Sequence, residues 1–217
     1  MTTPIPDVKP PNYPWQQITY GTDKIATMTY YYSDENSPLI PIRDVSHQMD
    51  AKRDPNIETK TYGLFSHCCK GERKAIVKKG ICTQFFCTSR GKPRTRVLTG
   101  YYQPKWYCEI ETGDFAIAAE RVRFVSPGFV LSDIVPYLEG FPIDCFFRTW
   151  KYIKDETVIK RLILLLNTAN DATNEYIAEV HKLENYALQQ YNRMYQDKLQ
   201  GFSWSDAGEL MRKEGLI

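Results

Sequence analysis

Short apolar runs separated by turn sequences fill residues 61 to 134, and this pattern most constrains the fold. The runs are rich in β-branched and aromatic residues, and the strings KGE, SRGKPR, ETGD and SPG punctuate them. Such spacing predicts β-strands joined by short turns. The expected strands cover residues 61–69, 75–79, 80–89, 95–110, 114–125 and 128–134, with one or two more within 18–32.

Many short strands with short connections favour a closed or strongly bent sheet. We therefore expect an α+β fold: a small bent β-barrel with a C-terminal helical segment. Residues 1–15 contain five prolines and predict an extended arm, because proline fixes φ and lacks an N–H donor. Residues 16–140 should form the β-barrel domain, and residues 141–217 the helical segment.

Helical spacing of apolar residues supports the C-terminal assignment. The first set is Ile159, Leu162, Ile163 and Leu166. A break at 167–171 precedes a second stripe, which predicts a long amphipathic helix. That stripe is Tyr176, Ile177, Val180, Leu183, Ala187, Tyr191, Met194 and Tyr195. It should dock on the β-domain or on a second copy, so a homo-oligomer or a partner protein is one expected association.

The chain has 217 residues, of which 42% are hydrophobic, and this suits one globular domain with a helical appendage. No run approaches the roughly 20 apolar residues that cross a bilayer. The first fifteen residues lack the basic start and apolar stretch of a signal peptide. We expect a cytoplasmic protein with no membrane partner, whose six cysteines are reduced.

Four cysteines fall within 26 residues, at Cys68, Cys69, Cys82 and Cys87. Zinc knuckles place ligand pairs two to four residues apart so that both sulfurs meet one tetrahedral centre. Adjacent cysteines in a strand face opposite sides, and so do Cys82 and Cys87. Reduced cysteine packs as a small hydrophobe. We favour core positions over metal or redox sites, and we expect neither a metal nor a cofactor.

Positive charge gathers in the middle of the chain. Residues 60–125 hold thirteen Lys and Arg against five Asp and Glu, whereas the section from Asp155 onward is mildly acidic. Cationic turns on a barrel suit phosphate contacts, and neighbouring aromatics suit stacking on bases. The candidate cations are Lys70, Arg73, Lys74, Lys78, Lys79, Arg90, Lys92, Arg94, Arg96, Arg121 and Arg123. The neighbouring aromatics are Tyr101, Tyr102, Trp106 and Tyr107.

Two details refine this interface. Lys70 to Lys79 should lie in a hairpin-like segment, and Arg121 and Arg123 should point to one side of a strand. Tyr101 and Tyr102 should face opposite ways, so one of them should line the ligand face. One alternative is a nucleic-acid-modifying enzyme such as a metal-dependent nuclease, in which Asp44 and Glu58 would hold the metal and Lys60 would orient water. A second alternative is a protein-interaction or oligomerisation module that acts through its long C-terminal helix.

The string TRVLTGYYQPKWYCEIETGDFAIAAERVRFV resembles the centre of PUA-like barrels of the EVE, ASCH and YTH kind, over about residues 60–135. The resemblance implies a compact barrel that binds RNA or DNA. In the EVE and YTH branches it implies an aromatic pocket for a modified base, here with Thr99, Gly100, Tyr101, Tyr102 and Trp106. The ASCH string G-x-K-x-x-E-x-R is missing, so no catalysis is carried over. We expect a nucleic-acid-binding module, with a modified nucleotide as one candidate ligand.

Overall fold

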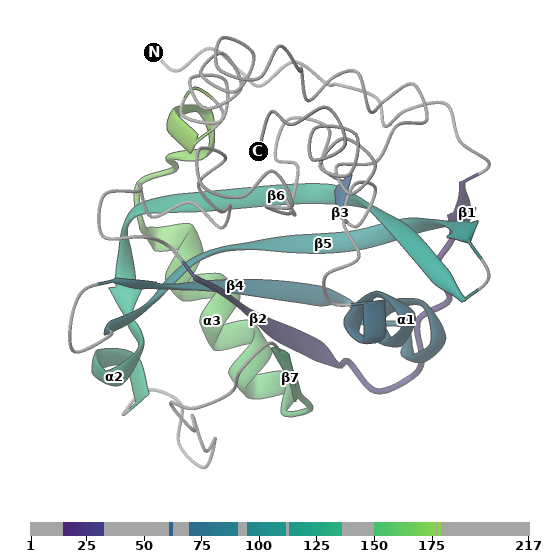
Figure 1. Ribbon diagram of the computed structural model, residues 1–217. Helices are drawn as coiled ribbons and strands as arrows, with labels where there is room; N and C mark the ends of the chain where they lie inside the picture. The colour runs from purple at the N-terminus through teal and green to yellow at the C-terminus, as the bar shows by residue number, and fades with distance from the viewer. Residues whose placement is uncertain are drawn as a thin grey trace, which may run out of the picture.

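The computed structural model describes residues 15–32, 61–62, 70–90, 95–111, 113–135, 150–176 and 178. These residues form one mixed sheet with helices on both of its faces (Figure 1). The strands are β1 (Gln16–Gln17), β2 (Ala26–Tyr32), β3 (Thr61–Tyr62), β4 (Thr83–Arg90), β5 (Thr95–Glu111), β6 (Asp114–Val130) and β7 (Trp150–Ile153). The helices are α1 (Lys70–Lys79), α2 (Leu131–Ile134) and α3 (Glu156–Thr168).

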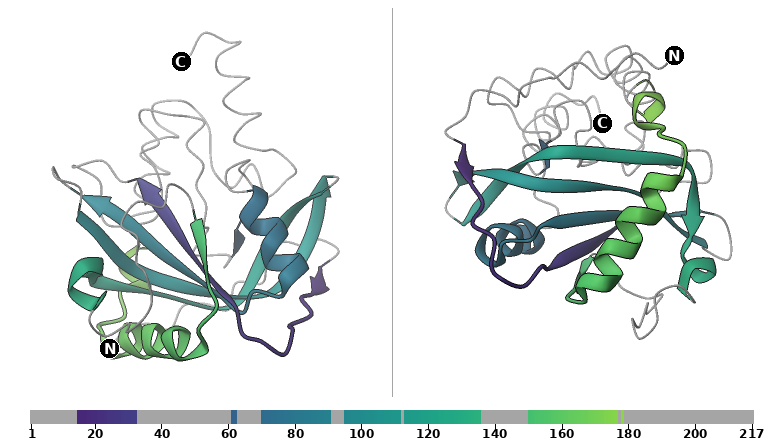
Figure 2. Two further views of the ribbon diagram at one scale, coloured as in Figure 1. Left: turned by 90° about the horizontal axis from the view of Figure 1, so that it is seen from below. Right: turned by 180° about the vertical axis from the view of Figure 1, so that it is seen from behind.

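The sheet is open within the described residues. Its strand order is β3-β6-β5-β4-β2-β7, with β1 paired to β5, and no described pairing joins β3 to β7. The sheet is strongly curved (Figure 2), but it is not the closed barrel that the sequence led us to expect. A mixed sheet with a few short helices agrees with the expected α+β class. Strand β7 extends the sheet from within the segment expected to be helical, because it pairs with β2.

Two cores lie on opposite faces of the sheet. One, on the side that carries α1, includes Ile76, Phe86, Tyr102 and Phe124, and we call this side the α1 face. The other lies against α2 and α3, and we call it the α3 face. Figure 2 shows α1 within the concave side of the sheet and α3 across the convex side. The buried residues of the second core include Met28, Phe85, Tyr101, Leu162 and Leu166.

Helix α1 corrects the prediction of a strand at 75–79 and of a hairpin-like segment from Lys70 to Lys79. The apolar run Ala75-Ile76-Val77 is too short to distinguish a strand from a helix by periodicity. The helix ends at Lys79, and the following Gly80 has a φ of 62°, which suits glycine. The N–H of Ile81 donates to the carbonyl of Ile76 at 3.0 Å, which is the closing bond of a Schellman motif.

Strands β4, β5 and β6 form an antiparallel meander close to its predicted place. The predicted SPG turn is wrong: β6 continues to Val130. Leu98 pairs with Phe129 whereas Gly100 pairs with Phe124, so extra β6 residues bulge between the two pairs. The predicted strand at 128–134 is therefore the end of β6 followed by α2.

Helix α3 confirms the helical spacing expected around residues 159–166. Asp155 is its N-cap and accepts hydrogen bonds from the N–H groups of Thr157 and Val158. Ile159, Leu162 and Leu166 are buried. Residues 173–176 are helical, and Tyr176 is buried and donates to the carbonyl of Val125 at 3.1 Å. The rest of the predicted Tyr176–Tyr195 stripe, beyond 178, lies outside the described residues, as does most of the proline-rich arm.

Candidate functional site

The cations expected in one basic cluster are divided between the two faces of the sheet. Lys74, Lys78 and Lys79 are exposed on α1. Arg73, in contrast, is fully buried, so it does not belong to the exposed set. Lys70 begins α1 and Arg90 ends β4. Lys92 and Arg94 lie outside the described residues.

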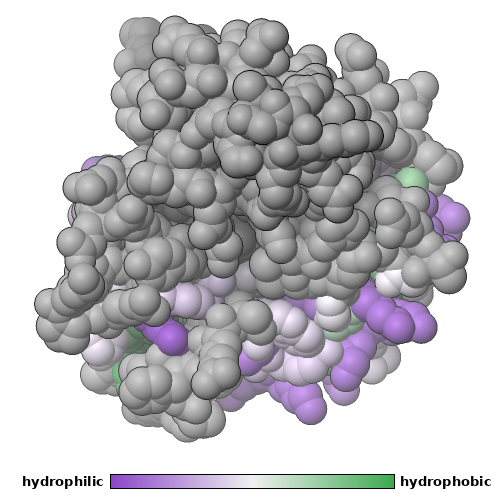
Figure 3. Space-filling model, viewed as in Figure 1, coloured by the Kyte–Doolittle hydropathy of each residue, from purple (hydrophilic) through white to green (hydrophobic). Residues whose placement is uncertain are grey.

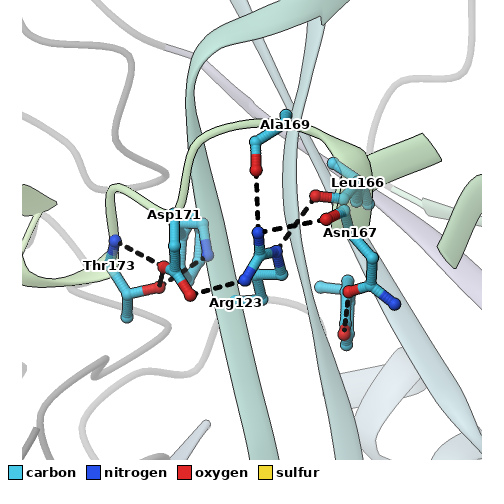
Figure 4. A network of polar contacts seen from close by, with 8 residues as sticks. Arg123, Leu166, Asn167, Ala169, Asp171 and Thr173 are labelled. Atoms are coloured by element: carbon cyan, nitrogen blue, oxygen red, sulfur yellow. Dashed lines mark hydrogen bonds and ion pairs between the residues drawn. The ribbon is translucent and has the colours of Figure 1, made fainter. Parts of the chain in front are cut away.

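Arg121 and Arg123 point to one side of β6, as predicted, but this is the α3 face. The guanidinium of Arg121 lies 5.9 Å from the centre of the Tyr101 ring. Arg123 is held by protein groups (Figure 4): it pairs with Asp171 and donates to the carbonyls of Leu166, Asn167 and Ala169. Its donors therefore bind the carbonyls at the end of α3 and do not face a ligand.

Arg96 also stacks within the protein, because its guanidinium lies 4.5 Å from the centre of the Tyr30 ring. The predicted basic rim therefore does not form one continuous surface. Among the described residues, α1 carries its most compact exposed part, at Lys74, Lys78 and Lys79. In Figure 3 the described surface seen on the side of α1 is mainly hydrophilic.

The expected aromatic pocket is not formed by the predicted residues. Tyr101 and Tyr102 do face opposite ways, but both are fully buried, each in a different core. Thr99 is also buried and donates to the carbonyl of Phe86 at 3.2 Å. Trp106 is half-buried five residues farther along β5, where it lies under Lys105. These four residues therefore do not converge on one ligand site.

A different group of polar side chains converges beneath α1. Parallel β2 and β4 and antiparallel β7 place alternate side chains on the α1 face in two rows across the sheet. Thr27, Thr29 and Gln84 contribute polar groups to these rows, and all three are fully buried. The rows are Gln84–Thr27–Tyr152 and Phe86–Thr29–Trp150.

Glu72 of α1 faces the same rows and is fully buried. The hydroxyl of Thr29 donates to Glu72 Oε1, and Gln84 Nε2 donates to Thr29 Oγ1 at 3.2 Å. A hydroxyl has one hydrogen to donate, and Thr29 donates it to Glu72. In the hydrogen bond between Thr29 and Gln84, the donor must therefore be Gln84. We call Thr27, Thr29, Glu72 and Gln84 the polar patch.

Two polar atoms of the polar patch have no hydrogen-bond partner in the part of the chain that the structure describes: Thr27 Oγ1 and Gln84 Oε1. Thr27 and Gln84 are register partners on neighbouring strands, so these atoms belong to adjacent side chains on one face. Buried polar atoms nearly always have partners in folded proteins, and each exception calls for an explanation. Two such exceptions, Thr27 Oγ1 and Gln84 Oε1, lie together in the polar patch beneath α1.

Aromatic side chains border the polar patch on its β7 side. The rings of Trp150 and Tyr152 meet edge to face with centroids 4.9 Å apart, and both residues are half-buried. Helix α1 reaches this border at both ends. A Cβ built on Gly71 would lie 4.0 Å from Trp150 Cζ2, and Lys79 Nζ lies 4.6 Å from the centre of the Tyr152 ring.

The cysteines agree with the core interpretation where they are described. Cys87 is fully buried, and burial raises the pKa of its thiol to about 12. Cys108 is buried and Cys82 is half-buried, and both are free thiols. Cys68 and Cys69 lie outside the described residues. Within the described part of the chain, no group of three or more His, Cys, Asp or Glu residues is placed to hold a metal ion.

Two further expectations concern the nuclease alternative and the membrane. Asp44, Glu58 and Lys60, the residues of the nuclease alternative, all lie outside it. Among the helices that are described, none has the length and apolar character needed to cross a membrane.

Comparison with known proteins yields no relative. No family model matches the chain, and no curated protein or solved structure is significantly similar to it. The resemblance to PUA-like barrels therefore stays a prediction, and function is inferred from the residues alone.

Proposed function

We propose that this protein binds nucleic acid and that helix α1 contacts the phosphates. The supporting observation concerns which exposed cations form ion pairs with described carboxylates and which do not. Lys74 and Lys78, four residues apart on one side of α1, have no carboxylate partner among the described residues. Elsewhere, Lys105 pairs with Glu120 and Arg123 with Asp171. Lysines that have no carboxylate partner in the described part of the chain suit phosphate, which they contact as point charges.

The interface is thus assigned to α1 and the adjoining β7 edge of the sheet, not to the strand turns. Lys79 extends the cationic side toward Tyr152, and Trp150 adds a half-buried aromatic ring nearby. Cations beside aromatic rings are the recurring composition of surfaces that bind single-stranded nucleic acid. Recognition of a modified nucleotide is a finer hypothesis within this proposal.

Oligonucleotide binding measured by fluorescence anisotropy tests the proposal. We expect single-stranded RNA or DNA to bind at low salt and the affinity to fall steeply between 50 and 200 mM salt, about as expected for counterion release. Lys74→Gln with Lys78→Gln should weaken binding and lower the salt slope by roughly one for each lost contact.

The matched control removes the same charge from another surface. Lys24 and Lys160 are exposed and both approach Glu156. Lys24→Gln with Lys160→Gln should therefore bind like the wild type. Equal affinity of the two double variants, or no binding of any oligonucleotide at 50 mM salt, would contradict the proposal.

A further inference from the structure

The direction of the hydrogen bonds in the polar patch leaves two acceptor atoms without a donor among the described residues. The hydroxyl of Thr29 donates its one hydrogen to Glu72, so the amide nitrogen of Gln84 must face Thr29. This fixes the amide orientation, and Gln84 Oε1 is left as an acceptor with no donor. The neighbouring Thr27 Oγ1 is likewise without a partner.

We propose that the polar patch binds the edge of a nucleobase, which donates N–H hydrogen bonds to Gln84 Oε1 and Thr27 Oγ1. This inference rests on the proposed function for the choice of ligand class. Within a low-dielectric interior an unmet acceptor is costly, and a donor from a ligand removes that cost. Guanine fits best, because its pairing edge presents N–H donors on two neighbouring atoms, N1 and N2, whereas thymine presents one N–H and an apolar ligand none.

Access runs over β7. Among the described strands β7 lies at one edge of the sheet. Trp150 and Tyr152 are half-buried there, whereas Thr27 and Gln84 behind them are fully buried. The patch is closed in this structure, so a base reaches it when α1 moves off the β7 edge. At that edge the helix contributes Gly71, which has no side chain, and the flexible side chain of Lys79. The rings of Trp150 and Tyr152 then border the base.

Nucleosides provide the test because they lack the phosphate that the lysines would bind. Guanosine and N1-methylguanosine differ only at the base N1–H, so binding to the full chain is compared by NMR chemical-shift perturbation. We expect guanosine to bind, and N1-methylguanosine to bind at least about tenfold more weakly than guanosine. Thr27→Val, which keeps the shape of the side chain, should weaken nucleoside binding about five- to tenfold.

Thr88→Val is the matched control. Thr88 lies on β4 four residues from Gln84, about 13 Å along the strand, and its hydroxyl is also buried without a partner. It should leave nucleoside binding unchanged. Both variants should fold at least as stably as the wild type, because each removes an unsatisfied hydroxyl. This separates loss of binding from loss of fold.

Three outcomes overturn the inference: no nucleoside binds, Thr27→Val binds nucleosides like the wild type, or Thr27→Val alone lowers the melting temperature by several degrees. The last result would mean that a trapped water already satisfies the hydroxyl. Oligonucleotide binding without nucleoside binding would reject the patch and leave the proposed function standing. Nucleoside binding unaffected by Lys74→Gln with Lys78→Gln, in a chain that binds no oligonucleotide, would support the patch and reject the phosphate contacts.

Discussion

Arg123 Nη1 lies 2.5 Å from Asp171 Oδ2, and this ion pair joins the middle of β6 to the segment that follows α3. The same guanidinium donates to the carbonyl of Leu166 at 3.0 Å and to that of Ala169 at 2.8 Å. The last carbonyls of a helix lack partners within the helix. Arg123 therefore supplies, from a neighbouring strand, the donors that the end of α3 needs.

Removing the Arg123 guanidinium should destabilise the fold without touching the proposed interface. We expect Arg123→Met to lower the free energy of unfolding by about 2–3 kcal/mol, because several carbonyls lose a charged donor. Asp171 is half exposed and still accepts from the N–H of Thr173, so Asp171→Asn should cost about 1 kcal/mol or less. Urea denaturation measures both, and equal costs would contradict this division of roles.

Gly100 lies where β5 meets β6 too closely for a side chain. A Cβ there would lie 2.3 Å from the carbonyl oxygen of Arg123 and 2.8 Å from Phe124 Cδ1. Because the first of these atoms is backbone, relief requires the strands to shift, and we expect Gly100→Ala to cost about 3 kcal/mol. Gly21→Ala is the control, since nothing lies within 4 Å of that position. Similar urea midpoints for the two variants would refute the clash.

Asp155 fixes the start of α3. Its carboxylate accepts from the N–H of Thr157 at 2.8 Å and of Val158 at 3.2 Å. Loss of such a cap typically costs about 1 kcal/mol, so Asp155→Ala should lower the unfolding free energy by that amount. Asp133 is exposed and does not cap a helix, and Asp133→Ala should stay within about 0.5 kcal/mol of the wild type. Thermal or urea unfolding decides between them.

The buried thiol of Cys87 should make stability fall in alkaline solution. Burial is the main cause that raises its pKa from 9.0 to about 12, and nearby Arg96 and Lys151 partly oppose this. Between pH 9 and 12 the unfolded chain releases a proton that the folded chain keeps. The unfolding free energy should therefore drop by about 1.4 kcal/mol per pH unit from this group.

Comparison of slopes isolates this effect, because Cys87→Ala also changes packing. Urea midpoints of the wild type and of Cys87→Ala at pH 7.5, 9 and 10 should show a shallower alkaline decline in the variant. In the native state at pH 8, iodoacetamide should modify the half-buried Cys82 well before Cys87. Parallel declines, or equal rates of modification by mass spectrometry, would argue against a protonated core thiol.

Local patterns predicted the meander and α3 because their signals lie within the elements themselves. Alternation placed Tyr101 and Tyr102 on opposite faces, and the 3.6-residue period placed Ile159, Leu162 and Leu166 on one side of a helix. What alternation could not show is that both faces of the sheet are covered. The sequence therefore suggested a ligand face at Tyr101 and Tyr102, where the structure has two cores.

The polar patch was not predictable for a different reason. It depends on the parallel pairing of Thr27 with Gln84, and on α1 lying above them. In the sequence, Thr27, Thr29 and Gln84 look like the solvent side of half-buried strands, and Glu72 like a turn residue. Only burial of all four distinguishes them, and burial arises from contacts between distant segments.

The same long-range pairing has a consequence for the order of folding. Strands β4, β5 and β6 follow one another in the sequence. Strand β2, in contrast, pairs with β4 across a long connection, and β7 pairs with β2, which is far from it in the sequence. Contacts between distant segments carry a larger loop-closure cost and form later. We expect the meander to assemble first and the half that holds the polar patch to be completed last. A ligand bound there would mainly lower the rate of unfolding, because it would stabilise the part of the chain that opens first.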